Sequence, residues 1–272
     1  MKTFFKSSSK IILSFILIFA LIDSDHLMAQ KQEMPEDLYY EIACFKFKKA
    51  GAMDFFISKG KKINQEMINR GIIDSWSFYR VDFPNGSDCE CNYRAVRVFR
   101  GIATLDKLKD RSIRDNIIRN IWPNKTSKDI SSEFNELIDF RYSHIFNMRD
   151  ALVPKPTHSA IMVVNFMDVE APNRTTYVQM EKEIFKPLHA SNLDAGNMVD
   201  WVLASRVMPH GSEVEVDFIT IDKYDSYDKM NRGDFNSSFK TVHPTLESQS
   251  TMNKMGKMRT LTRSEVWQTI EI

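Results

Sequence analysis

The feature that most constrains the fold of this chain is an internal duplication. Gly71 and Trp76 are matched by Gly196 and Trp201, 125 residues later. Other matched positions lie either 125 or 121 residues apart. The difference indicates a four-residue insertion or deletion between the two groups of matches. The matched pairs are Pro84 and Pro209, Gly86 and Gly211, Ser87 and Ser212, Asp88 and Glu213, Tyr93 and Phe218, Pro123 and Pro244, Ser143 and Ser264, Ile145 and Val266, and Phe146 and Trp267. Because chance agreement of Gly, Trp and Pro together is improbable, we infer that one module occurs twice.

Each copy contains the same succession of predicted elements, assigned from apolar spacing and turn residues. In the first copy, strands are predicted at 39–47, 75–83, 93–100 and 142–148, with helices at 53–70 and about 105–121 and a further helical stretch before the last strand. In the second copy, strands are predicted at 160–169, 201–208, 214–221 and 263–270, with helices at 175–192, 227–239 and 245–255. Each copy therefore has the β-α-β-β-α-β order of a ferredoxin-like module.

The predicted strands carry apolar residues on both faces. In strand 160–169, Ile161, Val163 and Phe166 stand beside Met162 and Val164. A sheet face left in water would be polar, so the helices must cover one face and the other module the second. We expect an α+β fold in which two tandem ferredoxin-like modules pack their sheets face to face as one intramolecular, eight-stranded α/β barrel.

The first 29 residues predict a secretory signal peptide. Lys2, Lys6 and Lys10 precede an apolar run at 11–22, and Ala29 ends the segment. As a helix this run would be about 18 Å long, short of the roughly 30 Å of a bilayer core. We therefore expect cleavage after about Ala29 and export to a bacterial periplasm or beyond, with an uncleaved anchor as the alternative. The expected organisation is a signal peptide (1–29), a first module (30–152), a linker (153–157) and a second module (158–272).

Charge and cysteine content limit the partners of the mature chain. Loss of the signal removes three lysines and two aspartates, which leaves 34 basic and 34 acidic residues. This balance argues against nucleic acid, and no further apolar run predicts a membrane span. We interpret Cys44, Cys89 and Cys91 as small buried or loop residues, with a disulfide of Cys44 as the alternative. The expected partner is a small apolar or aromatic molecule, and the chain is expected to be a monomer or a homodimer.

The second module carries a more specific pattern. Its predicted helix runs from Tyr177 to His189 and is followed by Gly196, Trp201 and a turn that ends in Gly211. This pattern resembles the helix-to-strand signature of secreted members of the dimeric α/β-barrel superfamily, in its tandem-repeat form, and the resemblance extends over residues 38–272. The resemblance implies the barrel fold. Members of this superfamily include cofactor-free monooxygenases, haem enzymes, isomerases and proteins with no known activity.

The first module departs from this pattern, so a site is expected in the second. The helix at 53–70 lacks the Pro-Leu-His ending, and Trp122 stands where the second module has His243. His189 is the candidate proton-transfer group because an ordinary histidine titrates near neutral pH; the alternative is a histidine that complements the helix C-terminus. Glu181 and His243 are candidate assisting groups. For Glu181 the alternative is an exposed glutamate paired with a lysine. For His243 the alternative is a purely structural histidine beside a proline that starts the last helical segment.

Four further residues are predicted to contact a ligand: Tyr177, Trp201, Arg263 and Trp267. Arg263 and Trp267 lie four residues apart on one strand and therefore share a face. Trp201 matches a tryptophan in the first module, and Tyr177 follows helical spacing, so core packing is the alternative for both.

The remaining histidines are assigned from their predicted elements. His144 and Glu265 occupy equivalent strand positions and are expected to face the same side, whereas His158 and His210 are expected at the surface. No metal site is predicted, because the histidines are scattered and no H-x-H or H-E-x-x-H occurs. No cofactor is predicted, with haem held by a single histidine as the alternative.

Together these features favour an exported small-molecule-binding protein with an apolar cavity between sheet and helix in the second module. If the chain is an enzyme, the resemblance implies cofactor-independent oxygenase or isomerase chemistry, with proton transfer by His189. A non-catalytic binding or assembly module with a purely structural barrel is the alternative, and a haem-binding protein is the third.

Overall fold

The computed structural model describes residues 37–86, 88–155, 157–210, 214, 216–232 and 235–270. The predicted signal peptide (1–29), Ser87, Pro156 of the linker and the turn residues 211–213 lie outside the described residues.

The elements of the first module are β1 (Leu38–Phe47), α2 (Ala52–Phe55), η1 (Phe56–Gly60), α3 (Lys61–Asn69), β2 (Ser75–Phe83), β3 (Tyr93–Arg100), α4 (Thr104–Lys109), α5 (Arg111–Ile121), α6 (Ser127–Leu137) and β4 (Ile138–Ala151). Those of the second are β5 (Ile161–Asp168), η2 (Ala171–Asn173), α7 (Arg174–Met180), η3 (Glu181–Phe185), α8 (Lys186–Asp194), β6 (Asp200–Met208), β7 (Phe218–Tyr224), α9 (Tyr227–Met230), α10 (Phe235–Val242), α11 (Ser248–Met258) and β8 (Thr260–Thr269). Elements η1 and η3 are π-helical turns, whereas η2 is a 3₁₀ turn.

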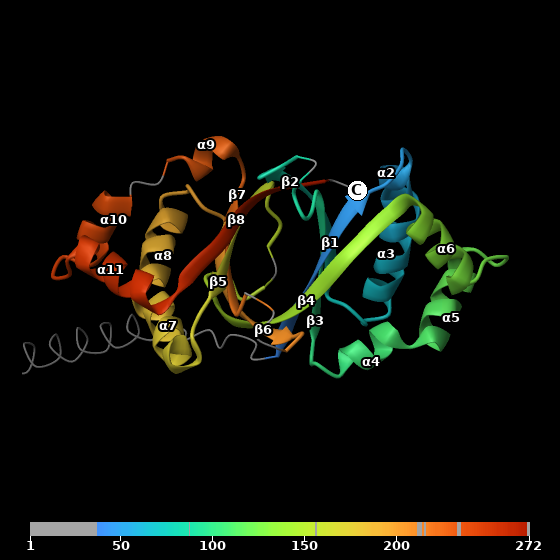
Figure 1. Cartoon of the computed structure of the whole chain (residues 1–272), viewed down its shortest axis with the longest axis horizontal. Coiled ribbons are helices and arrows are strands. Elements are labelled where there is room, and N and C mark those ends of the chain that lie inside the picture. Colours follow the sequence, from blue (N-terminus) through green and yellow to red (C-terminus); the bar gives the residue numbers. More distant parts are fainter. Residues whose placement is uncertain are drawn as a thin grey trace, which may run out of the picture. The chain divides into compact units, whose positions relative to one another are not determined.

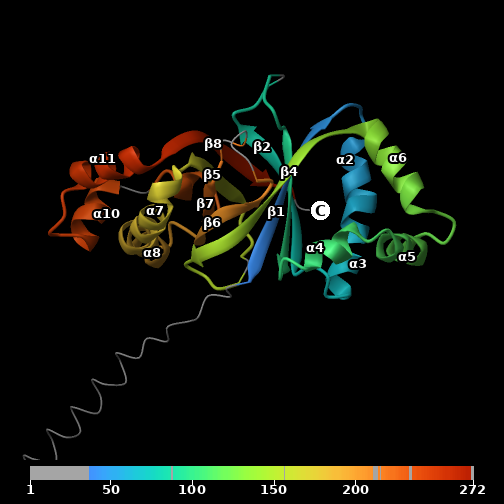
Figure 2. The same cartoon turned by 60° about the horizontal axis from the view of Figure 1, so that its bottom comes forward.

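The strands close into one antiparallel barrel in the order β1-β3-β2-β8-β5-β7-β6-β4. The two modules are hydrogen-bonded along two seams, β2 with β8 and β4 with β6. Helices α2 to α6 lie on one side of the barrel and α7 to α11 on the opposite side, as Figures 1 and 2 show. The predicted α+β fold and the eight-stranded barrel of two ferredoxin-like modules are confirmed.

Each strand presents alternate residues to two different environments, because side chains of a strand alternate between faces. On β6, Trp201 and Leu203 pack into a buried apolar cluster with the helices of the second module. Val202 and Ala204, on the opposite face, are also buried. We call these two faces the helix side and the barrel side.

Two predictions of secondary structure are wrong. The third strand of the second module begins at Phe218 and not at Val214. The alternating valines there resemble a strand, but the carbonyls of Val214 and Val216 accept hydrogen bonds from the Arg206 side chain instead of a neighbouring strand.

The second correction concerns Pro244, which was predicted to start the last helical segment and which is matched by Pro123 in the first module. Pro244 lies between the end of α10 at Val242 and the start of α11 at Ser248, and Pro123 lies between α5 and α6. A residue that precedes proline is driven out of the helical conformation, so these prolines mark the turn before each helix.

Cys44 and Cys91 form a disulfide, with a Cα–Cα distance of 5.4 Å. This corrects the interpretation of all three cysteines as unpaired residues and supports the alternative given for Cys44. Cys44 lies on β1, and Cys91 lies just before β3, which is the neighbour of β1. The third cysteine, Cys89, is a free thiol of intermediate exposure.

Candidate functional site

A group of polar and titratable side chains lies on the helix side of the second module. Tyr177 is on α7, Glu181 on η3 and His189 on α8, whereas Trp201 and Asp222 come from β6 and β7. Trp201 and Asp222 are directly paired across the two strands, so their side chains leave the sheet next to each other on the same face. The polar residues of α7, η3 and α8 therefore lie against Trp201 and Asp222.

The π-helical turn brings Glu181 and His189 to the same face of the helix. Their separation of eight positions would place them about 80° apart on a regular α-helix, but η3 widens one turn. Pro187 follows directly and has no N–H to donate to the preceding turn. His243 from the end of α10 donates from Nε2 to the carbonyl oxygen of Ile184 at 2.9 Å. His243 thus supports the irregular turn from outside and does not belong to the titratable group.

His189 connects Trp201 to Asp222. Its ring stacks on the Trp201 indole with 5.4 Å between centroids and 14° between planes. Its Nδ1 lies 3.8 Å from Asp222 Oδ1. These two atoms and Trp201 Nε1 are buried and have no hydrogen-bond partner in the described part of the chain. The His189 side chain is 23% exposed, so another edge of the ring reaches solvent.

Burial shifts the titration of three groups in this site. It raises the pKa of Asp222 to about 7, and a hydrogen bond from Asn165 lowers it in part. Burial likewise raises the pKa of Glu181 to about 7, although a hydrogen bond with Tyr177 and the positive charge of Arg259 lower it in part. For His189, burial lowers the pKa to about 4. At neutral pH the imidazole is therefore neutral, while both carboxyls exchange protons easily.

The first module serves as an internal reference for this arrangement. Trp76 pairs with Arg97 across β2 and β3 in the same register as Trp201 with Asp222. At the separation of 125 residues, the counterparts of the other three are Ala52 for Tyr177, Phe56 for Glu181 and Asn64 for His189. Asn64 accepts a hydrogen bond from Arg97 Nε at 2.8 Å. A ferredoxin-like module of this chain thus folds without the titratable set.

The sequence-predicted site residues divide between the two faces of the sheet. The structure brings Tyr177, Glu181, His189 and Trp201 together on the helix side. Arg263 and Trp267 instead contact Phe166 on the barrel side. These two residues do share a face, as expected.

The other histidines lie where the sequence placed them. His144 has a pKa lowered to about 4 by burial and by the charges of Arg206, Arg263 and Arg94. Its ring stacks on that of Tyr142 on the barrel side, the side that also holds the buried Glu265. His158 and His210 are exposed.

None of three pockets in the described structure is the apolar cavity expected around His189, Trp201 and Trp267. Both tryptophans are fully buried. These three pockets are lined by other residues, and one of about 280 Å³ lies beside Trp76 in the first module. Apolar side chains pack between helix and sheet in the second module.

Sequence reasoning missed Asp222 and its partner Asn165. Asn165 Nδ2 donates to Asp222 Oδ2 at 3.3 Å and to Thr220 Oγ1 at 3.2 Å. Asp222 lies one residue beyond the predicted end of its strand. An acidic residue paired across strands with a predicted core tryptophan was the available signal, but it required the correct bounds of β7.

Comparisons with known proteins identify the fold. No family model and no curated protein matches the sequence. Solved structures with the same fold include a protein provisionally assigned as a chlorite dismutase, with 8% identity, TM-score 0.50 and coverage of 86% of this chain and 95% of that chain. A protein provisionally assigned as a monooxygenase from Fusobacterium nucleatum has 10% identity and TM-score 0.50, and covers 88% and 94%. A mutant chlorite dismutase from Candidatus Nitrospira defluvii has 10% identity and TM-score 0.51, and covers 92% and 95%. At these identities the likeness shows a shared fold and no more.

Proposed function

We propose that the second module is a proton-transfer site for a small molecule, of the kind used by a cofactor-independent isomerase or oxygenase. The observation that carries this proposal is a pair of buried carboxyls, Glu181 and Asp222, whose pKa values are both raised to about 7 beside a neutral His189. Catalytic acids and bases work best with a pKa near the operating pH. The first module has Phe56 in place of Glu181 and Arg97 in place of Asp222, so the fold itself does not require these groups.

Asp222 is the better supported base, because its carboxylate, with a pKa of about 7, is more basic than the His189 imidazole, with a pKa of about 4. A carboxylate at Asp222 would accept a proton from an acidic C–H or O–H group, and the small molecule would keep the electron pair as an enolate or phenolate. Return of a proton from Glu181 at another carbon would complete an isomerisation, whereas reaction of the anion with dioxygen would begin an oxygenation. His189, with one edge in solvent and Nδ1 facing Asp222, would exchange protons between the carboxyl and water.

A second candidate function, haem binding, is tested by the space around His189. Chlorite dismutases are among the structural neighbours, and a histidine backed by a carboxylate is suitable donor chemistry for haem iron. However, Trp201 covers the face of the His189 ring, and buried side chains such as Phe218 and Leu188 fill the interface. The described residues therefore do not fit haem, and no step of the proposed chemistry involves it. A Soret band in protein purified from its native source would contradict this conclusion.

Solvent deuterium exchange tests the proposed function, because both reaction classes begin with removal of a proton from the substrate. The protein would be incubated in D₂O with a panel of 1,3-dicarbonyl compounds, hydroquinones and phenols, and deuterium incorporation would be followed by NMR alongside oxygen uptake. For a substrate that exchanges, Asp222→Asn should slow the reaction by about 100-fold or more. Asn64→Ala, the counterpart of a His189 change in the first module, should have no effect.

The outcomes separate the alternatives. Exchange at the same rate in wild type and Asp222→Asn would exclude Asp222 as the base, and an unchanged rate in His189→Ala would exclude a role for the imidazole. A panel member that binds without exchange would support the non-catalytic binding module.

We also propose that the chain is exported. The predicted signal at residues 1–29 is the basis of this proposal, and the Cys44–Cys91 disulfide supports it because structural disulfides persist in oxidising compartments. None of the helices in the described part of the chain has the length and hydropathy needed to cross a lipid bilayer. N-terminal sequencing of the protein from its native source should begin near Gln30; a terminus at Met1 would contradict cleavage.

A further inference from the structure

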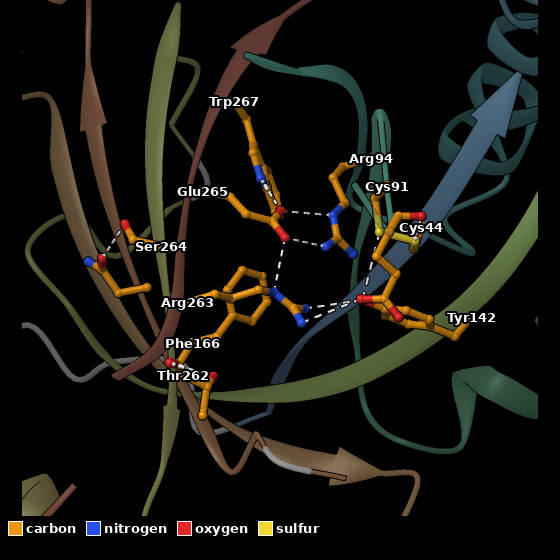
Figure 3. Close-up of polar contacts among 12 residues, drawn as sticks. Cys44, Cys91, Arg94, Tyr142, Phe166, Thr262, Arg263, Ser264, Glu265 and Trp267 are labelled. Atoms are coloured by element: carbon orange, nitrogen blue, oxygen red, sulfur yellow. Dashed lines mark hydrogen bonds and ion pairs between the residues drawn. A yellow bond between two sulfur atoms is a disulfide. The ribbon is translucent and has the colours of Figure 1, made fainter. Parts of the chain in front are cut away.

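The barrel side contains a second polar cluster, which joins the two modules (Figure 3). Arg94 on β3 donates from Nε and Nη2 to the Glu265 carboxylate on β8, at 3.1 and 2.6 Å. The side chain of Arg94 is completely buried, and that of Glu265 is 7% exposed. Trp267 Nε1 also donates to Glu265, at 2.7 Å. The carboxylate of Glu265 is therefore well provided with donors.

Arg94 nevertheless keeps one donor unused. Its Nη1 is buried and has no hydrogen-bond partner among the residues described. The guanidinium lies 5.5 to 5.6 Å from the ring centroids of Tyr142, Phe166 and Trp267. These rings stabilise the cation through their faces, but a buried N–H without an acceptor carries a free-energy cost. An acceptor that reached this nitrogen would remove that cost.

Arg263 forms the outer part of the cluster. Its guanidinium stacks over Phe166 at 4.1 Å, and Nη2 donates to the Tyr142 hydroxyl at 3.1 Å. The Arg263 side chain is 30% exposed, so the cluster opens to solvent on this side. In Figure 3 the guanidinium groups of Arg94 and Arg263 both face Tyr142.

Glu90 places a carboxylate on this outer part. Its Oε2 accepts a hydrogen bond from the Tyr142 hydroxyl at 2.9 Å and lies 3.5 Å from Arg263 Nη1. The Glu90 side chain is 51% exposed, and ion pairs at such exposure contribute little to stability. The next residue, Cys91, is bonded to Cys44, so the backbone is held while the glutamate side chain can rotate away.

We propose that Arg263, Tyr142 and Arg94 form a binding site for a small organic carboxylate, and that Glu90 occupies it as an intramolecular substitute. The ligand carboxylate would replace that of Glu90 on Arg263 and Tyr142, with one oxygen directed toward Arg94 Nη1. Arg263 Nε lies 3.0 Å from Glu265 Oε1, so the ligand carboxylate would be held by Arg263 Nη1 and by the Tyr142 hydroxyl. Hydrogen bonds from a charged donor to a carboxylate are among the strong ones. The rings of Phe166 and Tyr142 favour an aromatic substituent. This site is separate from the proton-transfer site, which lies on the helix side of the sheet.

Titration with 4-fluorobenzoate, followed by ¹⁹F NMR, tests the carboxylate site. Removing the competing charge with Glu90→Gln should tighten binding by about twofold to fivefold, the range expected for an exposed ion pair. Arg263→Gln should weaken binding by about tenfold or more, because a charge-assisted hydrogen-bond pair is lost. Two surface changes serve as matched controls, Glu136→Gln and Arg141→Gln, and should leave the affinity unchanged. Acetate should bind more weakly than 4-fluorobenzoate, and inorganic phosphate should not compete.

Several results would overturn the proposal. The first is that the Glu90→Gln variant does not bind 4-fluorobenzoate, and the second is that it binds it no more tightly than wild type does. The third is that Arg263→Gln binds 4-fluorobenzoate as tightly as wild type does. Competition by phosphate at the same concentration as the carboxylate would overturn the assignment of the ligand class. If circular dichroism shows that Arg263→Gln does not fold, Tyr142→Phe replaces it, and the loss of the hydroxyl donor should then weaken binding.

Discussion

Replacing Glu181 with glutamine should remove a large pH dependence from the stability of the protein. Burial raises the pKa of this carboxyl from 4.5 to about 7. At about 1.36 kcal/mol for each pKa unit, the difference between the folded and unfolded pKa of Glu181 corresponds to about 3 kcal/mol in the free energy of unfolding. The Glu181 side chain is almost entirely inaccessible to solvent, so water screens this interaction only slightly.

The direction of the effect follows from which state binds the proton more tightly. The folded state holds the proton of Glu181 up to about pH 7, whereas the unfolded chain loses it near 4.5. The contribution to stability is therefore fully present below about pH 4.5, declines as the pH rises, and is lost above about 7. His189 acts in the opposite direction, because its lowered pKa favours the folded state above 6.5 and loses that contribution as the pH falls toward 4. His189 and Asp222 are present in both proteins, so their contributions cancel when the variant is compared with wild type.

The assay is urea unfolding of wild type and Glu181→Gln at pH 5 and pH 8, followed by circular dichroism. Between these two pH values, wild type should lose about 2.5 kcal/mol more of its unfolding free energy than the variant does, because at pH 5 part of the contribution is already lost. Glu183→Gln, a change at an exposed residue in the same turn, is the matched control and should follow wild type. Parallel pH dependence in Glu181→Gln and wild type would refute the argument that burial holds this carboxyl protonated.

Three further substitutions test the supporting structure. Cys44→Ser opens a loop of 47 residues and should lower the unfolding free energy by about 4 kcal/mol on the chain-entropy account; equal melting temperatures with and without the bond would contradict this. Arg94→Leu leaves Glu265 buried without its main partner and should cost about 3 to 5 kcal/mol in urea unfolding, and a variant as stable as wild type would show that the pair is not buried. His243→Ala removes one hydrogen bond to the helix and should cost about 1 kcal/mol without slowing deuterium exchange; a slowed exchange would place His243 in the proton-transfer site.

The duplication made the barrel predictable because it repeats residues with a fixed conformational role. Gly71 and Gly196 end equivalent helices with φ values of 64° and 70°, a conformation that glycine adopts without a steric penalty. Two copies of a module with apolar strands on both faces then leave few alternatives to a closed sheet. The residues that distinguish the second module, His189 and Glu181, were also found by comparing the copies.

The parts that could not be predicted depend on which strand lies beside which and on the exact register of each pair. The Cys44–Cys91 bond crosses from β1 to the start of β3, and the sequence does not state that these strands are neighbours. Trp267 and Trp201 both belong to the second module, yet one faces the barrel and the other the helices. The π-helical turn at Glu181 changes which residues share a face, and a regular helical period does not describe it.

The protonation states of the helix-side group test the central claim most directly. NMR of protein with ¹⁵N-labelled histidine and ¹³C-labelled carboxyl groups, assigned with His189→Ala, Glu181→Gln and Asp222→Asn, would follow each group from pH 4 to 9. We predict a neutral His189 imidazole down to about pH 5, and carboxyl titrations near pH 7 that disappear in the Glu181 and Asp222 variants. An imidazolium at pH 7 beside two fully ionised carboxylates would contradict the proposal that this module holds a site for proton transfer.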